Sequence, residues 1–529
     1  MIKEKIENLI NDVLEDLKLP FFKNTPSIKL FSIEHPKRLD FGDYGTNLLI
    51  RMGPVGHTQQ IIDTLNKRLH LYPEIERIDE KMLFINFHLS KKFLAESLGE
   101  IIKQGGNFGK GEHAKGLRVM VEHTDPNPFK EFHIGHLMPN VIGSTIARIF
   151  QWNGAEVKQA NYQGDVGLHV AKALWKGDYV LGSRAYEEEP QAKSEIDEIN
   201  KKIYDKSDPE LNERYEKGRK ESLEKFEEIY QRLGSKFDYY FFESETAPIG
   251  KKIVEDNIGK VFEKSEGAVV FKGSHTRVFI NSQGIPTYEA KDLGNAKNKY
   301  DHYPYDLSVV VTGNEIKDYF RVVLEAMKQV LPDLAKKTKH IPHGMLRLPT
   351  GKMSSRTGTV IPAEELIEEV KKRTKGDEQV AIGAIKYMIL RQAIGHDIIF
   401  DLEKSVSTEG DSGVYLQYAH ARAHSLLEKA KDLSQPSPSQ GEGRGEVRVV
   451  ERLLYRFPEI VERAGAEYAP NYITTYLTEL ASAFNNFYAH EQVLDDSPES
   501  AYRLAIVEAF KIVMKNGLTI LGIPAPERM

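Results

Sequence analysis

Two short segments of the sequence carry residues whose types and spacing suit chemistry on a nucleotide. The first is His-Ile-Gly-His, from His133 to His136, which follows an apolar run and precedes a helical pattern. Histidines three residues apart at a helix start point to one side, and Gly135 between them lets a flat purine approach the backbone. The free amides of a helix N-terminus also favour phosphate. We therefore predict that His133, Gly135 and His136 bind ATP and that both histidines are catalytic.

The second segment is Lys-Met-Ser-Ser-Arg, from Lys352 to Arg356, in a region rich in turn residues. A lysine on a loop can bring a point charge onto a phosphate and withdraw it after reaction. We predict that Lys352 is catalytic and that Lys352, Ser354 and Ser355 bind ATP. Each segment alone is weak evidence, because an isolated histidine pair is more often structural. The two in this order, each after a predicted strand, indicate an ATP site.

The elements that would position these segments follow from the pattern of apolar residues. Six short apolar runs predict strands, at residues 117–122, 156–162, 268–271, 277–280, 307–311 and 343–348. Strands that alternate with helical patterns predict a Rossmann-like, doubly wound parallel sheet, which binds nucleotides where strands end and helices begin. Pro139 suits the first turn of a helix, so the helix after the first segment is predicted to begin no earlier than about Gly135.

The chain of 529 residues has room for about three domains. Residues 1–112 begin with an amphipathic helical pattern and predict a small α/β domain. Residues 113–405 contain both segments, and the charged stretch at about 175–267 within them predicts an inserted helical subdomain. Residues 406–529 predict an all-α helix bundle. A Pro/Gly/Ser/Gln tract at 434–447 predicts a disordered surface loop within that bundle.

Composition limits the classes of function. Lys and Arg number 72 against 78 Asp and Glu, so a nucleic-acid partner would have to meet local basic patches. The chain has no cysteine, which excludes disulfides, catalytic thiols and cysteine-ligated zinc and suits a reducing compartment. No segment is apolar enough to cross a membrane. We predict a soluble, cytoplasmic protein with no protein-bound structural metal.

Longer blocks of sequence surround the two segments and extend across the chain. The first segment belongs to VEHTDPNPFKEFHIGH, at 121–136, a pattern much more specific than two histidines. The remaining blocks are FGDYGTN at 41–47, NYQGDVG at 161–167, PTYEAKDLGN at 286–295, YLQYAHAR at 415–422, FNNFY at 484–488 and LGIPAPERM at 521–529. Together they resemble the arginyl-tRNA synthetase family of class I aminoacyl-tRNA synthetases. The resemblance implies that residues 1–112 bind the tRNA elbow and that residues 406–529 bind the anticodon.

Three residues are of the types that a guanidinium site needs. Carboxylates such as Glu122 and Asp292 accept its planar fork of donors, and a ring such as Tyr288 holds the plane. Tyr288 and Asp292 are four residues apart, on one face if that segment is helical. By resemblance, these three hold the arginine side chain and Asn127 holds its α-amino group. Without the resemblance, Glu122 reads as a surface charge, Asn127 as a turn residue and Tyr288 as a core aromatic.

The resemblance also implies a reaction. It is the ATP-dependent attachment of L-arginine to tRNA(Arg) through an arginyl-adenylate, with Mg²⁺ accompanying ATP and release of AMP and pyrophosphate. The histidines and Lys352 would stabilise charge on phosphate oxygens. Adenine would meet the backbone near Met345, and Lys130 would be a second phosphate contact, an exposed lysine being the alternative reading. We further expect a monomer whose adenylate formation requires tRNA.

Three positions depart from the family pattern. Met138 replaces an arginine, Asp125 stands where serine is common, and Ile316 stands where glutamine or histidine is usual. Three other functions remain as alternatives: a class I synthetase for glutamate, glutamine or cysteine, a silent RNA-binding paralogue, and a small nucleotidyltransferase. The absence of cysteine opposes a thiolate metal site for cysteine specificity. The intact histidines and Lys352 oppose the paralogue, and the predicted helix bundle opposes the nucleotidyltransferase.

Overall fold

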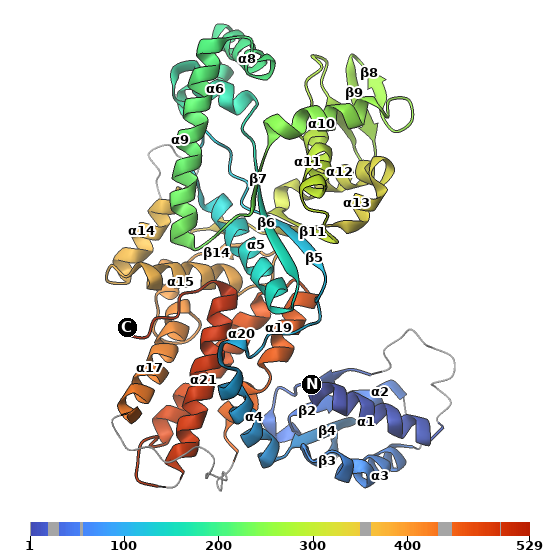
Figure 1. Ribbon diagram of the computed structural model, residues 1–529, viewed down its shortest axis with the longest axis vertical. Helices are drawn as coiled ribbons and strands as arrows, with labels where there is room; N and C mark the ends of the chain where they lie inside the picture. Colours follow the sequence, from blue (N-terminus) through green and yellow to red (C-terminus); the bar gives the residue numbers. More distant parts are fainter. Residues whose placement is uncertain (1, 19–30, 53–56, 350–360, 432–446, 498) are drawn as a thin grey trace.

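The computed structural model describes residues 2–18, 31–52, 57–349, 361–431, 447–497 and 499–529 (Figure 1). The predicted ATP-binding residues Lys352, Ser354 and Ser355 lie outside the described residues. So does most of the tract at 434–447. None of the described helices is both long enough and apolar enough to cross a membrane.

A five-stranded parallel sheet occupies the middle of the molecule (Figure 1). Its spatial order is β12-β11-β5-β6-β7, and every neighbouring pair is parallel. The chain enters at the central strand β5 and builds outward on both sides, which confirms the predicted doubly wound arrangement. The strands are β5 (Arg118–Glu122), β6 (Glu156–Gln163), β7 (Tyr239–Phe242), β11 (Leu307–Gly313) and β12 (Thr338–His343).

Helix α5 (Ile134–Trp152) follows β5 and packs with the sheet in one hydrophobic core. It begins at Ile134, one residue before the predicted limit, because the side chain of His133 caps its N-terminus. Pro139 therefore lies beyond the first turn, inside the helix, and its predicted placement was wrong. Both histidines nevertheless lie at the N-terminal end of the helix, as predicted.

Two predicted strands of the parallel sheet belong to a different sheet. Strands β9 (Ala268–Lys272) and β10 (Thr276–Ile280) pair antiparallel, and β8 (Glu263–Ser265) completes a three-stranded sheet. The three residues between β9 and β10 are too few for the crossover that parallel strands require. The predicted strand at 343–348 is also divided, because β12 ends at His343 and β13 (Leu346–Arg347) pairs with β14 (Ile398–Ile399).

The predicted helical insertion is helical in its first part. Figure 1 shows these helices extending from the central sheet, away from the N-terminal sheet. The last residues of the predicted range differ, because β7 joins the central sheet and is followed by α10 (Glu243–Glu255) and β8. Four aromatic residues in β7 are too few to show a period in the sequence. The helices are α6 (Leu168–Lys176), α7 (Tyr179–Glu188), α8 (Pro190–Asp205) and α9 (Pro209–Leu233).

The remaining helices around the sheet lie between β10 and the bundle. Three of them, α11, α12 and α13, share a core with the three-stranded sheet. Helices α14, α15 and α16 pack with the central sheet and the bundle. Their bounds are α11 (Tyr288–His302), η5 (Asn314–Ile316), α12 (Lys317–Val330), α13 (Pro332–Lys337), α14 (Ala363–Arg373), α15 (Glu378–Leu390) and α16 (Leu402–Ser405).

The N-terminal unit is a small α/β fold with its own core, as predicted. Its four strands form an antiparallel sheet in the order β1-β2-β4-β3. One residue of the bundle, Tyr455, is a member of this core and meets Phe93 edge to face, 5.6 Å between ring centroids. The elements are α1 (Ile2–Asp16), β1 (Ile33–Glu34), η2 (Leu39–Phe41), β2 (Tyr44–Thr46), α2 (Leu48–Met52), α3 (Thr58–Arg68), η3 (Leu69–Leu71), β3 (Ile75–Lys81), β4 (Phe84–Leu89), α4 (Lys91–Gln104) and η4 (Gly105–Asn107).

The C-terminal part is a helix bundle, as predicted. Its apolar faces merge with the core of the central sheet, so the bundle packs directly against the part of the chain that contains this sheet. Phe484 and Phe510 stack inside it with ring centroids 3.8 Å apart. The helices are α17 (Gly413–Lys431), α18 (Val449–Leu454), α19 (Phe457–Ala466), α20 (Asn471–His490) and α21 (Ser500–Leu521).

Candidate active site

The two histidines of the first segment form the cap of α5. Nδ1 of His133 accepts a hydrogen bond from the Gly135 amide at 3.0 Å, and the His133 amide donates to Nδ1 of His136 at 3.3 Å. The rings stack with centroids 3.8 Å apart. Because both Nδ1 atoms accept, these bonds assign each ring proton to Nε2. Each histidine therefore keeps one N–H donor for a ligand.

The surroundings of both histidines favour the neutral ring, because they lower both pKa values. Burial lowers the pKa of His133 and takes the pKa of His136 well below its usual value, and the charge of Lys130 lowers both further. The Lys130 ammonium lies over the ring of Tyr179 in α7, 4.9 Å from its centroid. Neutral rings of this kind suit hydrogen bonding to phosphate oxygens better than proton transfer. Lys130 is held by the insertion in this structure.

Glu122 lies buried at the carboxyl end of β5, where it already has partners. Its Oε2 accepts from Asn295 Nδ2 at 2.9 Å and forms an ion pair with Lys299 Nζ at 2.7 Å. Both partners come from α11, the helix that begins with Tyr288. The charge of Glu122 is therefore compensated before any guanidinium arrives, which the sequence did not indicate.

Asp292 lies on the same helix, one turn after Tyr288, as the four-residue spacing predicted. The hydroxyl of Tyr319 donates to its Oδ2 at 2.5 Å. Burial raises the pKa of Asp292 to about 7, with the charges of Glu122 and Glu243 acting in the same direction. Tyr288 is more than half exposed, at 57 %. Asp292 is thus a partly buried carboxyl group whose pKa is raised towards neutrality.

Asn127 makes a close approach to a glycine of the NYQGDVG block. A Cβ on Gly164 would lie 2.3 Å from Asn127 Oδ1 and 3.1 Å from Glu243 Oε1, so these two oxygens converge on the glycine. Glu243 in turn forms a buried ion pair with Lys291 at 2.6 Å. Glu243 and Lys291 were not among the predicted site residues.

Asp125, at the position where the family often has serine, is tied to the sheet. Its Oδ1 accepts from the Tyr162 amide in β6 at 2.8 Å. The loop around it has three non-glycine residues in the left-handed region, Thr124, Asp125 and Phe129, with φ of 83°, 46° and 67°. Burial, and then the charge of Glu122, raises the pKa of Asp125 well above its usual value. The acidic side chain therefore holds a strained loop in place.

The other named positions lie as follows. The amide of Met345 donates to Asp397 Oδ1 at 2.9 Å, and its carbonyl oxygen accepts from the Ile398 amide at 2.8 Å. Both backbone groups that were predicted to meet adenine therefore have protein partners. Met138 is buried in the main core and Ile316 ends η5.

Residues that the sequence analysis missed could have been found by helical spacing. Asn295 and Lys299 follow Asp292 by three and seven residues, so all three share one face of α11. Tyr319 comes from α12 and has no such signal. Within the described part of the chain, no three His, Asp or Glu side chains gather where they could hold a metal ion.

The bundle brings together two of the sequence blocks noted above. Arg422 of α17 lies between the rings of Tyr418 and Tyr488, 4.8 and 5.0 Å from their centroids. Its Nη1 donates to Asn485 Oδ1 at 2.8 Å. Both tyrosines are partly exposed, at 37 % and 40 %. An arginine between two accessible rings is suited to stacking with nucleic-acid bases. We call Tyr418, Arg422, Asn485 and Tyr488 the aromatic cluster.

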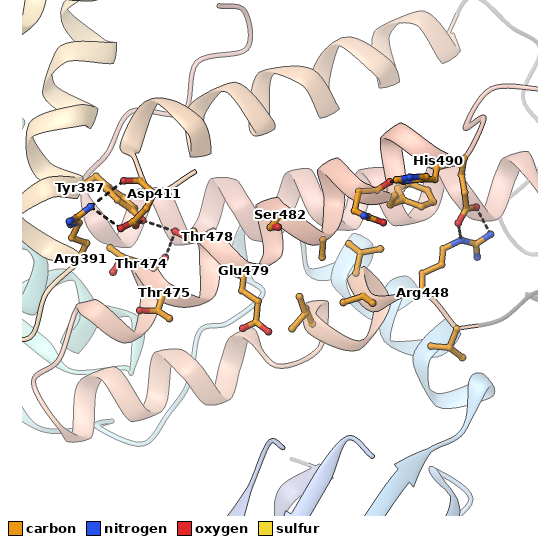
Figure 2. A pocket seen from close by; sticks show the side chains of 18 residues that line it. Tyr387, Arg391, Asp411, Arg448, Thr474, Thr475, Thr478, Glu479, Ser482 and His490 are labelled. Carbon is orange, nitrogen blue, oxygen red and sulfur yellow. Dashed lines mark hydrogen bonds and ion pairs between the residues drawn. The ribbon is translucent and has the colours of Figure 1, made fainter. Parts of the chain in front are cut away.

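A groove of about 1130 Å³ runs along α20 in the same bundle. Figure 2 shows the Arg391–Asp411 pair at one end and Arg448 at the other, with Glu479 and Ser482 between them. Arg391 is 2.7 Å from Asp411, and Arg448 is 2.6 Å from Glu491, so both cations are already compensated. The groove offers hydroxyl and amide groups but no free positive charge for phosphate among these residues.

The parallel sheet and the histidine-capped helix after its central strand define the catalytic fold of a class I aminoacyl-tRNA synthetase. Residues 97–221 and 178–381 match the family described as "tRNA synthetases class I (R), catalytic domain". Residues 4–89 match "Arginyl tRNA synthetase N terminal domain", and residues 416–529 match "DALR anticodon binding domain". The chain belongs to the arginyl-tRNA synthetase family, whose members carry arginine–tRNA ligase activity.

Individual relatives agree over the full length. The chain is 30% identical to an arginine–tRNA ligase of Streptococcus suis, covering 95% of this chain and 97% of the relative. It is 29% identical to the enzyme of Ligilactobacillus salivarius, covering 94% and 96%. The solved arginyl-tRNA synthetase of Thermus thermophilus has the same fold, with a TM-score of 0.74, 24% identity and 100% of both chains covered. The predicted family and fold class are confirmed.

Proposed function

We propose that this chain activates L-arginine with ATP, forms arginyl-adenylate with release of pyrophosphate, and transfers the arginyl group to tRNA(Arg) with release of AMP. The observation that carries the proposal is that Glu122, at the carboxyl end of β5, contacts α11 on the helix face that also carries Asp292, and that its charge acts on Asp292. Ligands of doubly wound sheets bind at this edge. Membership of the family supports the same activity.

In this reaction the arginine carboxylate attacks the α-phosphorus of ATP. Negative charge grows on the phosphate oxygens, and the Nε2–H groups of His133 and His136 donate to them. The free amides at the start of α5, around Gly135, add to this field. Mg²⁺ would accompany ATP, held mainly by the phosphates and water. Lys352 would supply a further positive charge, a role that rests on the sequence alone.

The guanidinium of arginine would be held by the acidic pair and Tyr288. Because Lys299 already compensates the charge of Glu122, Asp292 would supply the net negative charge of the site. Glu122 would accept hydrogen bonds from the guanidinium. The accessible ring of Tyr288 would cover the guanidinium plane. Asn127 would receive the α-amino group, with Glu243 close by on the same side of Gly164.

The tRNA would be bound by both ends of the chain. The aromatic cluster would stack with bases of the anticodon, and the N-terminal unit would contact the elbow. These roles are supported by the matches to an anticodon-binding domain and to the family's N-terminal domain. We also propose that the protein is a monomer and that it is cytoplasmic; the second proposal is in keeping with a chain that contains no cysteine.

The direct test is ATP–pyrophosphate exchange and tRNA charging with each of the twenty amino acids, with and without tRNA(Arg). Arginine alone should support charging, and exchange should require tRNA. Charging with glutamate or glutamine would refute the assigned specificity. Arginine-dependent exchange by RNA-free protein would leave the specificity intact and contradict only the requirement for tRNA.

A further inference from the structure

Two cations at the base of the catalytic fold have no carboxylate partner among the described residues. Lys386 of α15 is buried, at 1 % exposure, and its Nζ donates to the carbonyl oxygens of Leu233 and Gly522, both at 2.6 Å. Arg148 of α5 donates from Nε to the carbonyl oxygen of Ile520 at 2.9 Å. These cations therefore contact the backbone of two different helices, α9 and α21.

The acceptors are the ends of two helices. Leu233 is the last residue of α9, and Gly522 is the C-cap of α21. The last carbonyl groups of a helix lack partners within it and carry the negative end of its dipole. The junction is also tightly packed, because a Cβ on Gly522 would lie 2.2 Å from Arg148 Nη2 and 3.1 Å from Lys386 Nζ. Lys386 thus holds the ends of α9 and α21 together.

From the end of α9, hydrogen bonds continue to the substrate loop. The hydroxyl of Ser235 donates to Asn140 Oδ1 in α5 at 2.7 Å, and Asn140 Nδ2 donates to Thr124 Oγ1 at 3.1 Å. All three side chains are buried. Thr124 directly precedes Asp125, in the strained loop that also carries Asn127. The end of α9 is therefore connected to the residues proposed to bind arginine.

From the end of α21, packing continues to the RNA side of the bundle. Phe510 of α21 stacks on Phe484 of α20, and α20 carries Asn485 and Tyr488 of the aromatic cluster. α21 also reaches α5 directly, through the contact between Arg148 and Ile520. One helix therefore connects the aromatic cluster with the junction around Lys386.

An apolar side chain would serve simple packing at this position better than a lysine. A buried cation without a carboxylate loses its hydration, and well-packed apolar residues are often equally stable or more stable in its place. Burial, and then the charge of Arg148, takes the pKa of Lys386 well below its usual value. What lysine adds over an apolar residue is a specific link between two helix ends.

We propose that Lys386 is a positioning residue that couples the RNA-binding bundle to the arginine and ATP site, by joining the ends of α21 and α9. This inference rests on the proposed function. Binding of tRNA at the aromatic cluster would set the position of α21. Because Lys386 is hydrogen-bonded to the ends of both helices, α9 would move together with α21, and Asn140 and the loop before Asn127 would move with α9.

The test compares two variants that each remove two hydrogen bonds between a buried side chain and backbone carbonyl groups. Lys386→Met keeps the approximate length of the side chain and removes the hydrogen bonds to the ends of α9 and α21. Asn516→Leu is the matched control, since Asn516 is buried on α21 and its Nδ2 donates to the carbonyl oxygens of Gly105 and Phe108 at 2.9 and 3.0 Å, away from the catalytic helices. Arginine-dependent exchange is measured with saturating tRNA and normalised to titrated active sites.

We expect Lys386→Met to lower kcat about tenfold, within the range of coupling along packed networks, while KM for arginine and Kd for tRNA change less than about twofold. Asn516→Leu should leave all three near wild type. Ser235→Ala is a milder variant that interrupts the same path further on, and it should lower kcat about threefold with Kd for tRNA unchanged. It carries the test if Lys386→Met does not fold.

Equal loss of kcat in Lys386→Met and Asn516→Leu would overturn the coupling, as would loss of kcat matched by loss of tRNA binding. Wild-type rates in Ser235→Ala, or losses from Ser235→Ala and Lys386→Met that simply add, would also overturn it. Wild-type protein in the same assay separates these outcomes, because failure to use arginine would refute the proposed function instead.

Discussion

At the scale of single residues, the proposed arginine site can be tested through the charge of Asp292. Its pKa of about 7 means that the carboxyl group is protonated in acid and ionised in base. A guanidinium binds the ionised form, so affinity for arginine is lost as pH falls through 7. We expect Kd for arginine, measured by calorimetry, to be constant above about pH 8 and to rise about tenfold per pH unit below 7.

The control for this prediction is Asp292→Asn, which keeps the shape of the side chain. It should weaken arginine binding by about 2 kcal/mol, or about thirtyfold, at pH 8 and should remove the dependence on pH. A wild-type Kd that does not change between pH 6 and 8 would show that Asp292 is not in the pocket.

A second residue-scale prediction concerns the close approach at Gly164. In Gly164→Ala the new methyl group would meet Asn127 Oδ1 at 2.3 Å, so Asn127 must move. We expect KM for arginine to rise about tenfold or more, since misplacing a substrate-positioning group by about 1 Å is costly. Steady-state charging kinetics measure it.

The matched control is Gly99→Ala in α4, where a Cβ meets no atom within 4 Å. That substitution should leave KM unchanged and stabilise the helix by up to about 1 kcal/mol. Unchanged KM in Gly164→Ala would mean that Asn127 does not hold the substrate.

The residue types of this site were predictable from the sequence, but their partners were not. Glu122 and Asp292 could be proposed as guanidinium ligands because carboxylates suit that group and the surrounding blocks resembled a family. That Lys299 already neutralises Glu122 depends on how α11 docks against β5, which no local pattern encodes. The hydrogen-bond partner of the Met345 amide could not be predicted for the same reason, because Asp397 lies 52 residues further along the chain.

At the scale of elements, Asp165 attaches the long helix α9 to the sheet. This fully buried carboxylate accepts from the Ser244 amide and hydroxyl at 2.9 and 2.7 Å, from Tyr215 at 3.1 Å and from Arg219 Nε at 3.0 Å. Asp165→Asn removes the charge opposite Arg219. We expect the free energy of opening α9 to fall by about 3 kcal/mol, measured by hydrogen exchange of its amides.

Glu188→Gln is a suitable comparison for Asp165→Asn. It breaks an exposed ion pair with Arg184, one helical turn away in α7. Exposed pairs of this kind contribute at most about 1 kcal/mol, so exchange in α9 should not change. Equal effects of the two substitutions would contradict the role given to Asp165.

Element types were predicted more reliably than element partners. The apolar runs of β9 and β10 correctly indicated strands, yet they pair with each other and not with the central sheet, because a short apolar run does not specify its neighbour. The capped start of α5 was within one residue of the prediction, since histidines, glycine and proline give local signals at a helix end.

At the scale of the whole molecule, a polar contact joins the N-terminal unit to the bundle. Glu459 of α19 accepts from the hydroxyl of Tyr44 and lies 3.3 Å from Nε2 of His35. Glu459→Gln keeps the shape and removes the charge. We expect the free energy of opening β2 and β4 to fall by about 2 kcal/mol, measured by hydrogen exchange.

Kinetics should separate this contact from the catalytic chemistry. Because Glu459 contacts Tyr44 and His35 and not the histidine-capped start of α5, kcat for arginine-dependent exchange in Glu459→Gln should stay within about twofold of wild type. Glu96→Gln, which affects an exposed pair with Lys92, should change neither quantity. A large loss of kcat in Glu459→Gln would show that the contact acts beyond the N-terminal unit.

The membership of Tyr455 in the N-terminal core has a consequence for the order in which the molecule is made. The other buried side chains of that core end at Leu94, so a ribosome must add about 360 residues before the last one appears. At about 5–20 residues per second, this takes on the order of 20 to 70 s. During that interval Phe93 lacks its ring partner, and the newly made unit is incomplete. A nascent chain halted before Tyr455 should therefore be cut by protease in β1–β4, whereas one halted after α19 has left the exit tunnel should resist.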